Sequence, residues 1–228
     1  MSEDSIEKAL FLLLGWALGL LAPAIVEAIK RQREALQVRI TLLGELHELK
    51  YRLAVSAYAA EKRFGIVDRP YLQWLRSMII EYKGSKPRDS ILDAIDMQLS
   101  FTDEQIAHVA KTELADSKGA LTLKKYFAPL LDSRIPSLWY LDSRLQQLLL
   151  EVRSELNLLN EEIDQARYYF GLTFTNLDSE NHSRVSGNLT ESYRQIAKRA
   201  RLTADKIGEL ETCASKRQVK NFRFGCFQ

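Results

Sequence analysis

An uncharged apolar run near the amino terminus dominates the hydrophobic pattern of this chain. It extends from Ala9 to Val26, reads ALFLLLGWALGLLAPAIV and contains no ionisable side chain. A helix of this length spans roughly 27 Å, close to the hydrocarbon thickness of about 30 Å of a lipid bilayer. Two further apolar residues extend the run if Glu27 lies at the membrane interface. The pattern therefore predicts a transmembrane helix over residues 9–29.

Two other interpretations of this run fit the residues less well. A buried helix of a soluble protein rarely contains so long an uncharged stretch. A cleaved signal peptide has a basic start and a shorter apolar core. This chain begins with the acidic segment MSEDSIEK, and its basic cluster follows the run. We therefore interpret the run as an uncleaved anchor.

The charges beside the run predict its orientation. Residues 1–29 carry one basic and four acidic side chains, a net charge of −3, and the remainder carries 31 basic and 26 acidic side chains, a net charge of +5. Positively charged flanks stay in the cytoplasm, and Lys30, Arg31 and Arg33 follow the run directly. We expect a single-pass protein of the cell membrane, with residues 1–8 outside, the large carboxy-terminal part cytoplasmic, and these three side chains at lipid headgroups.

Two glycines within the run are candidates for contact between membrane helices. Gly15 and Gly19 lie four residues apart, so they expose one face of a helix to close approach by a neighbour. This spacing predicts a homo-oligomer, although glycine is also generally common in membrane helices. Pro23 lacks a backbone donor and is expected to kink the helix about one turn earlier.

Helical periodicity continues after the anchor. A helix is expected over about 30–64, with a coiled-coil-like seam of apolar and small residues spaced four and three apart. The seam consists of Leu42, Leu46, Leu49, Leu53, Ser56 and Ala60. Further helices are expected at 69–83, 87–100, 102–115, 137–170 and 189–214. Residues 121–136 are expected to be irregular with one short helical piece, and a polar connection is expected before residue 189.

No strand-like alternation is evident, so the predicted fold class is all-α. We expect a single transmembrane helix followed by a cytoplasmic helical bundle over residues 30–214, with a basic and aromatic tail over 215–228. Hydrophobic residues make up 46% of the chain and charged residues 27%, which excludes a disordered chain and a wholly membrane-embedded one. Cys213 and Cys226 are the two cysteines, too few for a disulfide framework.

Residues typical of catalysis or metal binding are sparse. The three histidines are His47, His108 and His182, and no phosphate-binding, dinucleotide-binding or zinc-protease motif is present. Glu104 and His108 share one helix face, but two ligands make an incomplete metal site. His47 is expected to be solvated between two glutamates. We therefore expect no catalytic residue, no metal and no cofactor.

Charged clusters are expected to lie on solvated faces. Glu161, Glu162 and Asp164 form an acidic group in which Asp164 can pair with Arg167. A basic stripe on the last helix consists of Arg194, Lys198 and Arg201. This stripe and the tail could meet anionic lipid, but a net charge of +5 is too modest to favour nucleic-acid binding.

Three functions are compatible with these features. The first is a membrane-anchored interaction or scaffold protein that self-associates or docks a cytoplasmic protein partner, without catalysis. The second is a membrane-acting effector, such as a bacterial defence or toxin component, whose clustered spans perturb the membrane. The third is a membrane-tethered enzyme with an unfamiliar helical site around His108 or Glu161. No family resemblance is carried by these residues.

Overall fold

Helices account for nearly all of the described chain. The computed structural model describes residues 3–62, 67–84, 88–116, 123–176 and 178–225. Within these ranges it has seven α-helices, one 3₁₀-helix and no strand, which confirms the predicted all-α class. The elements are α1 (Glu3–Lys62), α2 (Arg69–Glu81), α3 (Asp89–Leu99), α4 (Asp103–Asp116), α5 (Pro129–Arg134), η1 (Ile135–Tyr140), α6 (Ser143–Leu172) and α7 (Ser179–Gly225).

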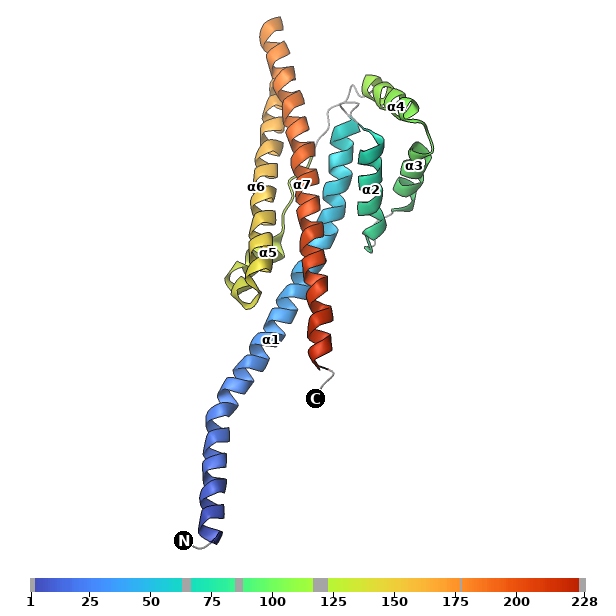
Figure 1. Cartoon of the computed structure of the whole chain (residues 1–228). Coiled ribbons are helices and arrows are strands. Elements are labelled where there is room, and N and C mark those ends of the chain that lie inside the picture. The colour runs from blue at the N-terminus through green and yellow to red at the C-terminus, as the bar shows by residue number, and fades with distance from the viewer. Residues whose placement is uncertain (1–2, 63–66, 85–87, 117–122, 177, 226–228) are drawn as a thin grey trace.

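Helix α1 joins the predicted anchor to the packed part of the molecule without interruption. It contains 60 residues, and Pro23 lies inside it. Figure 1 shows that the blue, amino-terminal half of α1 projects from the packed helices and changes direction along its length. The predicted helices at 9–29 and 30–64 are therefore parts of one helix.

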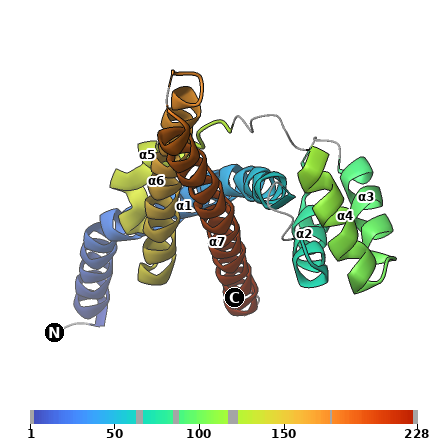
Figure 2. The same cartoon turned by 90° about the horizontal axis from the view of Figure 1, so that it is seen from above.

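The inner half of α1 packs against α6 and α7 around the larger of two hydrophobic clusters (Figures 1 and 2). The leucines of the predicted seam are buried in it, and α7 contributes small side chains that allow its backbone to approach closely. Buried members include Leu42, Leu46, Leu49 and Leu53 of α1, Leu148, Val152 and Leu159 of α6, and Ala200, Ala204 and Ile207 of α7. The seam is thus covered by helices of the same chain.

A second hydrophobic cluster lies on another face of α1. Helices α2, α3 and α4 pack around it, to the side of α1 away from α6 in Figure 2. Helix α1 supplies Tyr51 and Ala54, while α2 supplies Leu72, Leu75 and Ile79. Because both clusters contain α1 residues, α1 is the spine that the two groups of helices share.

Local capping signals place several boundaries as predicted. The Asp68 carboxylate accepts a hydrogen bond from the backbone N–H of Tyr71 at 2.8 Å and so caps α2. At the start of α4, Thr102 and Gln105 form a reciprocal capping box, with the Thr102 N–H donating to Gln105 Oε1 at 2.8 Å.

The predicted start of the long helix at residue 137 was wrong. Residues 135–140 form the 3₁₀-helix η1, and α6 begins only at Ser143. Asp142 has extended backbone angles and accepts a hydrogen bond from the Leu145 N–H at 3.1 Å, which sets this boundary. The apolar spacing continued across η1, but the cap decided where the α-helix begins.

The last helix is longer than predicted at both ends. Its start at Ser179 replaces much of the expected polar connection, because Asp178 accepts a hydrogen bond from the Asn181 N–H at 2.8 Å. Glu180 and Arg184 form an i,i+4 ion pair on this exposed first stretch. The helix also continues to Gly225 through much of the expected tail, and residues 226–228 lie outside the described ranges.

Candidate functional site

The outer half of α1 is the most distinctive surface of the molecule. Every side chain from residue 10 to residue 30 is exposed, including the large apolar ones, and Leu12 is 75% exposed. By length and composition α1 is apolar enough to cross a membrane, and it is the one helix among the described residues with this property. Helix packing within the chain leaves this surface uncovered.

The two glycines of the predicted anchor face open space in the part of the chain that the structure describes. A Cβ atom built on either Gly15 or Gly19 would meet no other part of the described chain within 4 Å. The glycine face is thus available to a second helix, and self-association through it stays a prediction.

The basic cluster after the apolar run lies beside a segment that sequence analysis did not connect to it. Lys30, Arg31 and Arg33 are all exposed. The Arg31 Nε lies 3.1 Å from a Glu27 carboxylate oxygen, and its guanidinium lies over the Trp139 ring, 5.6 Å from the centroid. Helix η1, far along the sequence, therefore packs beside the first turns of α1 after the apolar run.

A polar cluster around one buried lysine connects α1, α2 and α7 on the inner half of α1. The Lys50 side chain is only 2% exposed, and its ammonium lies 2.8 Å from Glu81 Oε2 and 2.5 Å from Glu211 Oε2. Burial by itself lowers the pKa of Lys50, but the hydrogen bonds to Glu211 and Glu81 outweigh it and raise the pKa above its usual value. Lys50 is therefore a charged residue in the interior, held by two carboxylates.

His47 belongs to this cluster, so the expectation that it is solvated was wrong. Its Nδ1 lies 2.8 Å from Glu211 Oε1, and its Nε2 accepts a hydrogen bond from the Lys83 backbone N–H at 3.2 Å. Because Nε2 accepts, we assign the proton of the neutral ring to Nδ1, which donates to Glu211. The Tyr82 hydroxyl donates to Glu48 at 2.5 Å.

We call the cluster of His47, Lys50, Glu81 and Glu211 the polar clamp. It joins the end of α2 to both α1 and α7. Its hydrogen bonds connect positions that are far apart in the sequence: Lys50 and Glu81 are separated by 31 positions, and Glu211 lies more than 160 positions after Lys50 and His47. No local sequence pattern could therefore reveal the clamp. Chemically, the clamp holds compensated charges rather than a free nucleophile or base, and its evident effect is to fix helix positions.

The residues of the predicted basic stripe have different surroundings. Arg201 lies over the rings of Trp74 and Tyr71, at 4.9 and 5.3 Å from their centroids, and the Trp74 N–H donates to Asp205 at 2.7 Å. Arg194 pairs with Glu191, three residues earlier on α7, and Lys198 is exposed. Arg201 thus attaches α7 to α2 through cation–π contacts and is not a free member of a basic surface.

The acidic group predicted on α6 is engaged by basic side chains. Asp164 lies 2.5 Å from the Lys125 ammonium and 3.9 Å from Arg167, which confirms the expected pair with Arg167. Glu162 approaches Arg199 of α7 at 3.6 Å. These contacts tie α6 to its neighbours.

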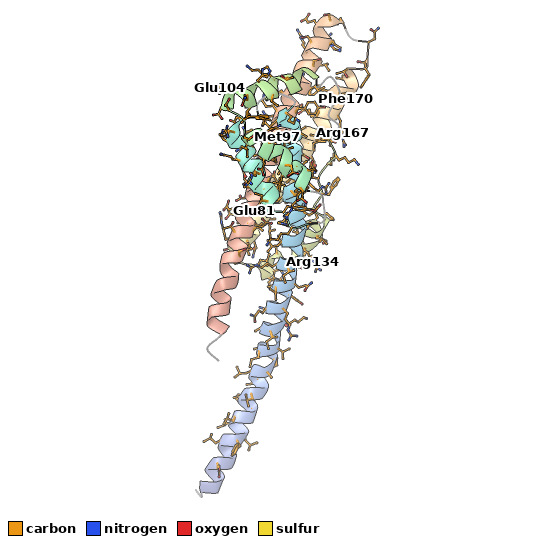
Figure 3. The ribbon with its side chains drawn as sticks, turned by 90° about the vertical axis from the view of Figure 1, so that its right-hand side faces the viewer. Glu81, Met97, Glu104, Arg134, Arg167 and Phe170 are labelled. Atoms are coloured by element: carbon orange, nitrogen blue, oxygen red, sulfur yellow. The ribbon has the colours of Figure 1, made fainter. Side chains whose placement is uncertain are left out.

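The concave site between α6 and α7 is small. A cavity of about 20 Å³ lies between α6 and α7, lined partly by Arg167 and Phe170, which Figure 3 labels. Space of this size accommodates about one water molecule. Glu104 and His108 are both exposed. The described residues include no group of three or more histidine, cysteine or acidic side chains placed to hold a metal ion.

The chain was compared with protein-family models, curated proteins and solved structures. No family model matches the chain, and no curated protein or solved structure matches it either.

Proposed function

We propose that this chain is a single-pass membrane protein whose anchor carries a cytoplasmic helical bundle that serves as an interaction or scaffold module. The observation that carries the proposal is the exposure of the whole apolar outer half of α1, from Leu10 to Ile29. Leaving so much apolar surface in water is unfavourable by about 25 cal/mol per Å², whereas a bilayer covers it.

The continuity of α1 supports a scaffold in which anchor and bundle move together. The same helix leaves the membrane and forms the spine of both hydrophobic clusters. Because the leucine seam is already buried inside the chain, self-association draws its contacts from the outer half, where Gly15 and Gly19 are open. Docking of a cytoplasmic partner would use the outer surface of the bundle.

A pair of matched arginine substitutions tests the anchor. Leu14→Arg with Leu18→Arg places two charges at the middle of the run, each costing about 3 kcal/mol of insertion free energy. The control, Leu36→Arg with Ile40→Arg, has the same spacing on exposed positions of α1 beyond the run. We expect carbonate washing of isolated membranes to release the first variant and leave the control and the native chain bound. Full-length native chain in the washed supernatant would refute the proposal.

Orientation is tested on the same membranes. In inverted vesicles, added protease should digest the helical bundle and spare a short amino-terminal fragment containing the anchor. Protection of the bundle would place it on the opposite side of the membrane.

A further inference from the structure

Helix η1 lies at the level where α1 leaves its apolar run. The Arg31 guanidinium lies over the Trp139 ring at 5.6 Å from its centroid. The neighbouring Tyr140 hydroxyl is hydrogen-bonded to the Glu34 side chain, which is the main reason that the pKa of Tyr140 is raised. Two successive aromatic residues are thereby fixed to the first turns of α1 after the predicted anchor.

The height of this contact along α1 matches the headgroup layer of a bilayer. Arg31 follows Val26, the last residue of the uncharged run, by about 7.5 Å of helix rise. The polar layer on each side of the hydrocarbon is about 5–8 Å thick, given a total thickness of about 40–45 Å. Side chains attached to α1 at Arg31 are therefore within reach of lipid headgroups whenever the run spans the hydrocarbon.

The exposed side chains of α5 and η1 near Arg31 are of types that occur at the interface between the hydrocarbon core of a bilayer and water. Trp139 is 56% exposed and Leu130 is 41% exposed, although both are large and apolar. Arg134, also exposed, lies between them in sequence, and Figure 3 shows it near the end of the packed helices from which the outer half of α1 projects. Tryptophan and tyrosine are enriched at membrane interfaces because each combines an apolar ring with a polar group.

We infer that the segment α5–η1 is a second membrane contact, in which Trp139 and Tyr140 lie in the headgroup layer and Arg134 faces lipid phosphates. This inference rests on the proposed membrane anchor. The contact gives the anchored chain a second point of attachment, so that the packed helices hold a fixed tilt on the membrane surface. A bilayer is the occupant that the geometry favours, because α1 carries the segment to that height.

The three tryptophans of the chain allow a direct test. Trp16 lies in the apolar run, Trp139 in η1, and Trp74 in the packed helices, where it donates to Asp205. Full-length chains that retain a single tryptophan, with phenylalanine at the other two positions, are reconstituted in vesicles whose lipids carry bromine at a shallow or a deep position of the acyl chain. We expect Trp139 to lose about half of its fluorescence, more to shallow than to deep bromine, as an interfacial ring should.

Trp16 and Trp74 are the matched controls. Trp16 should be quenched most strongly by deep bromine, and Trp74 should keep its fluorescence in all vesicles. Quenched Trp16 with unquenched Trp139 would overturn the second contact and leave the anchor intact, assigning the exposed ring to a protein partner. Unquenched Trp16 would overturn the anchor and this inference together.

Loss of Trp74 removes a hydrogen bond and could unfold the packed helices, so a second measurement avoids this substitution. The Trp16→Phe chain is compared with the Trp16→Phe, Trp139→Phe chain, both retaining Trp74. The difference in fluorescence between them isolates Trp139. A difference that bromine does not quench would equally overturn the inference.

Discussion

Both halves of α1 contain leucines, but the leucines of the two halves have opposite surroundings. Leu13, in the outer half, is 64% exposed, whereas Leu46, in the inner half, is fully buried. Both leucines belong to one continuous helix. Helix formation is satisfied by hydrogen bonds within the segment, but burial needs a partner that the segment does not contain. The inner half is buried against α6 and α7, whereas the outer half has no such partner among the described residues.

The largest effect on the free energy of unfolding is expected when one leucine from each half of α1 is replaced by alanine and the two variants are compared. Leu46→Ala should lower the free energy of unfolding of the packed helices by about 4 kcal/mol, because it leaves a cavity in the larger hydrophobic cluster. Leu13→Ala should leave it unchanged. Urea unfolding in mild detergent measures both values when it is followed by Trp74 fluorescence in chains that also carry Trp16→Phe and Trp139→Phe. Equal losses for the two variants would mean that the outer half also packs against the rest of the chain.

The next effect concerns the polar clamp on the inner half. Lys50→Met should cost about 3 kcal/mol of unfolding free energy, since it leaves the partly buried Glu211 carboxylate without its cation. Adding Glu211→Gln removes the charge nearest to the lost ammonium, so the double variant should be more stable than Lys50→Met. A double variant less stable than the single one would show that Lys50 and Glu211 do not compensate one another.

The same clamp predicts how stability changes at high pH. Because the folded pKa of Lys50 is raised above 10.5, its contribution is fully present below that pH and is lost as the pH rises through the folded value. The native chain should therefore lose more unfolding free energy than Lys50→Met as the pH rises from 10 to 12. Parallel losses in urea titrations at these two pH values would contradict the raised pKa.

A smaller, stabilising effect is expected at Gly44, within the inner half. A Cβ atom there would meet nothing within 4 Å, and the position is exposed. Gly44→Ala should raise the free energy of unfolding by about 1 kcal/mol, because alanine favours the helix. Gly15→Ala, in the outer half, serves as the control and should leave the unfolding of the packed helices unchanged. A loss of stability in Gly44→Ala would show that the continuous helix is strained there.

The glycine pair is expected to have no effect on folding and a clear effect on association. Gly15→Ile with Gly19→Ile should leave urea unfolding as it is and reduce self-association in a membrane reporter assay, since bulk blocks close helix approach. Leu13→Ile with Ala17→Ile places isoleucines at the same spacing on the opposite helix face and should associate normally. Equal association of both variants would remove the glycine face from the proposal.

Capping residues show which parts of the fold could be predicted from sequence. Asp68 and Thr102 were recognised as helix starts because their residue types favour the N-cap position. In the structure, each side chain accepts a hydrogen bond from the backbone N–H three residues later. Asp178 acts in the same way, yet the polar composition of the stretch after it suggested a connection. That error has a physical cause: exposed helices with polar residues on every side lack the apolar stripe that sequence analysis detects.

Some candidate site residues could likewise be identified from the sequence, whereas the surroundings of others could not. The apolar run, Gly15 with Gly19, and the cluster of Lys30, Arg31 and Arg33 were identified from the sequence. The structure shows that they are exposed, and their roles at a membrane stay predictions. His47 and Arg201 were expected on solvated surfaces, but His47 is part of the polar clamp and Arg201 lies over aromatic rings. Their partners come from other helices, so spacing along one helix carried no information about them.

By itself, the sequence determined the apolar run, the all-helical class and the helix starts at Asp68 and Thr102, because these depend on residues within a few positions of one another. Only the tertiary structure decided that the leucine seam is covered by α6 and α7, that Lys50 is buried between two carboxylates, and that Trp139 lies beside Arg31. These features arise where distant segments meet, and their energies come from desolvation and contact between helices, which no local pattern specifies.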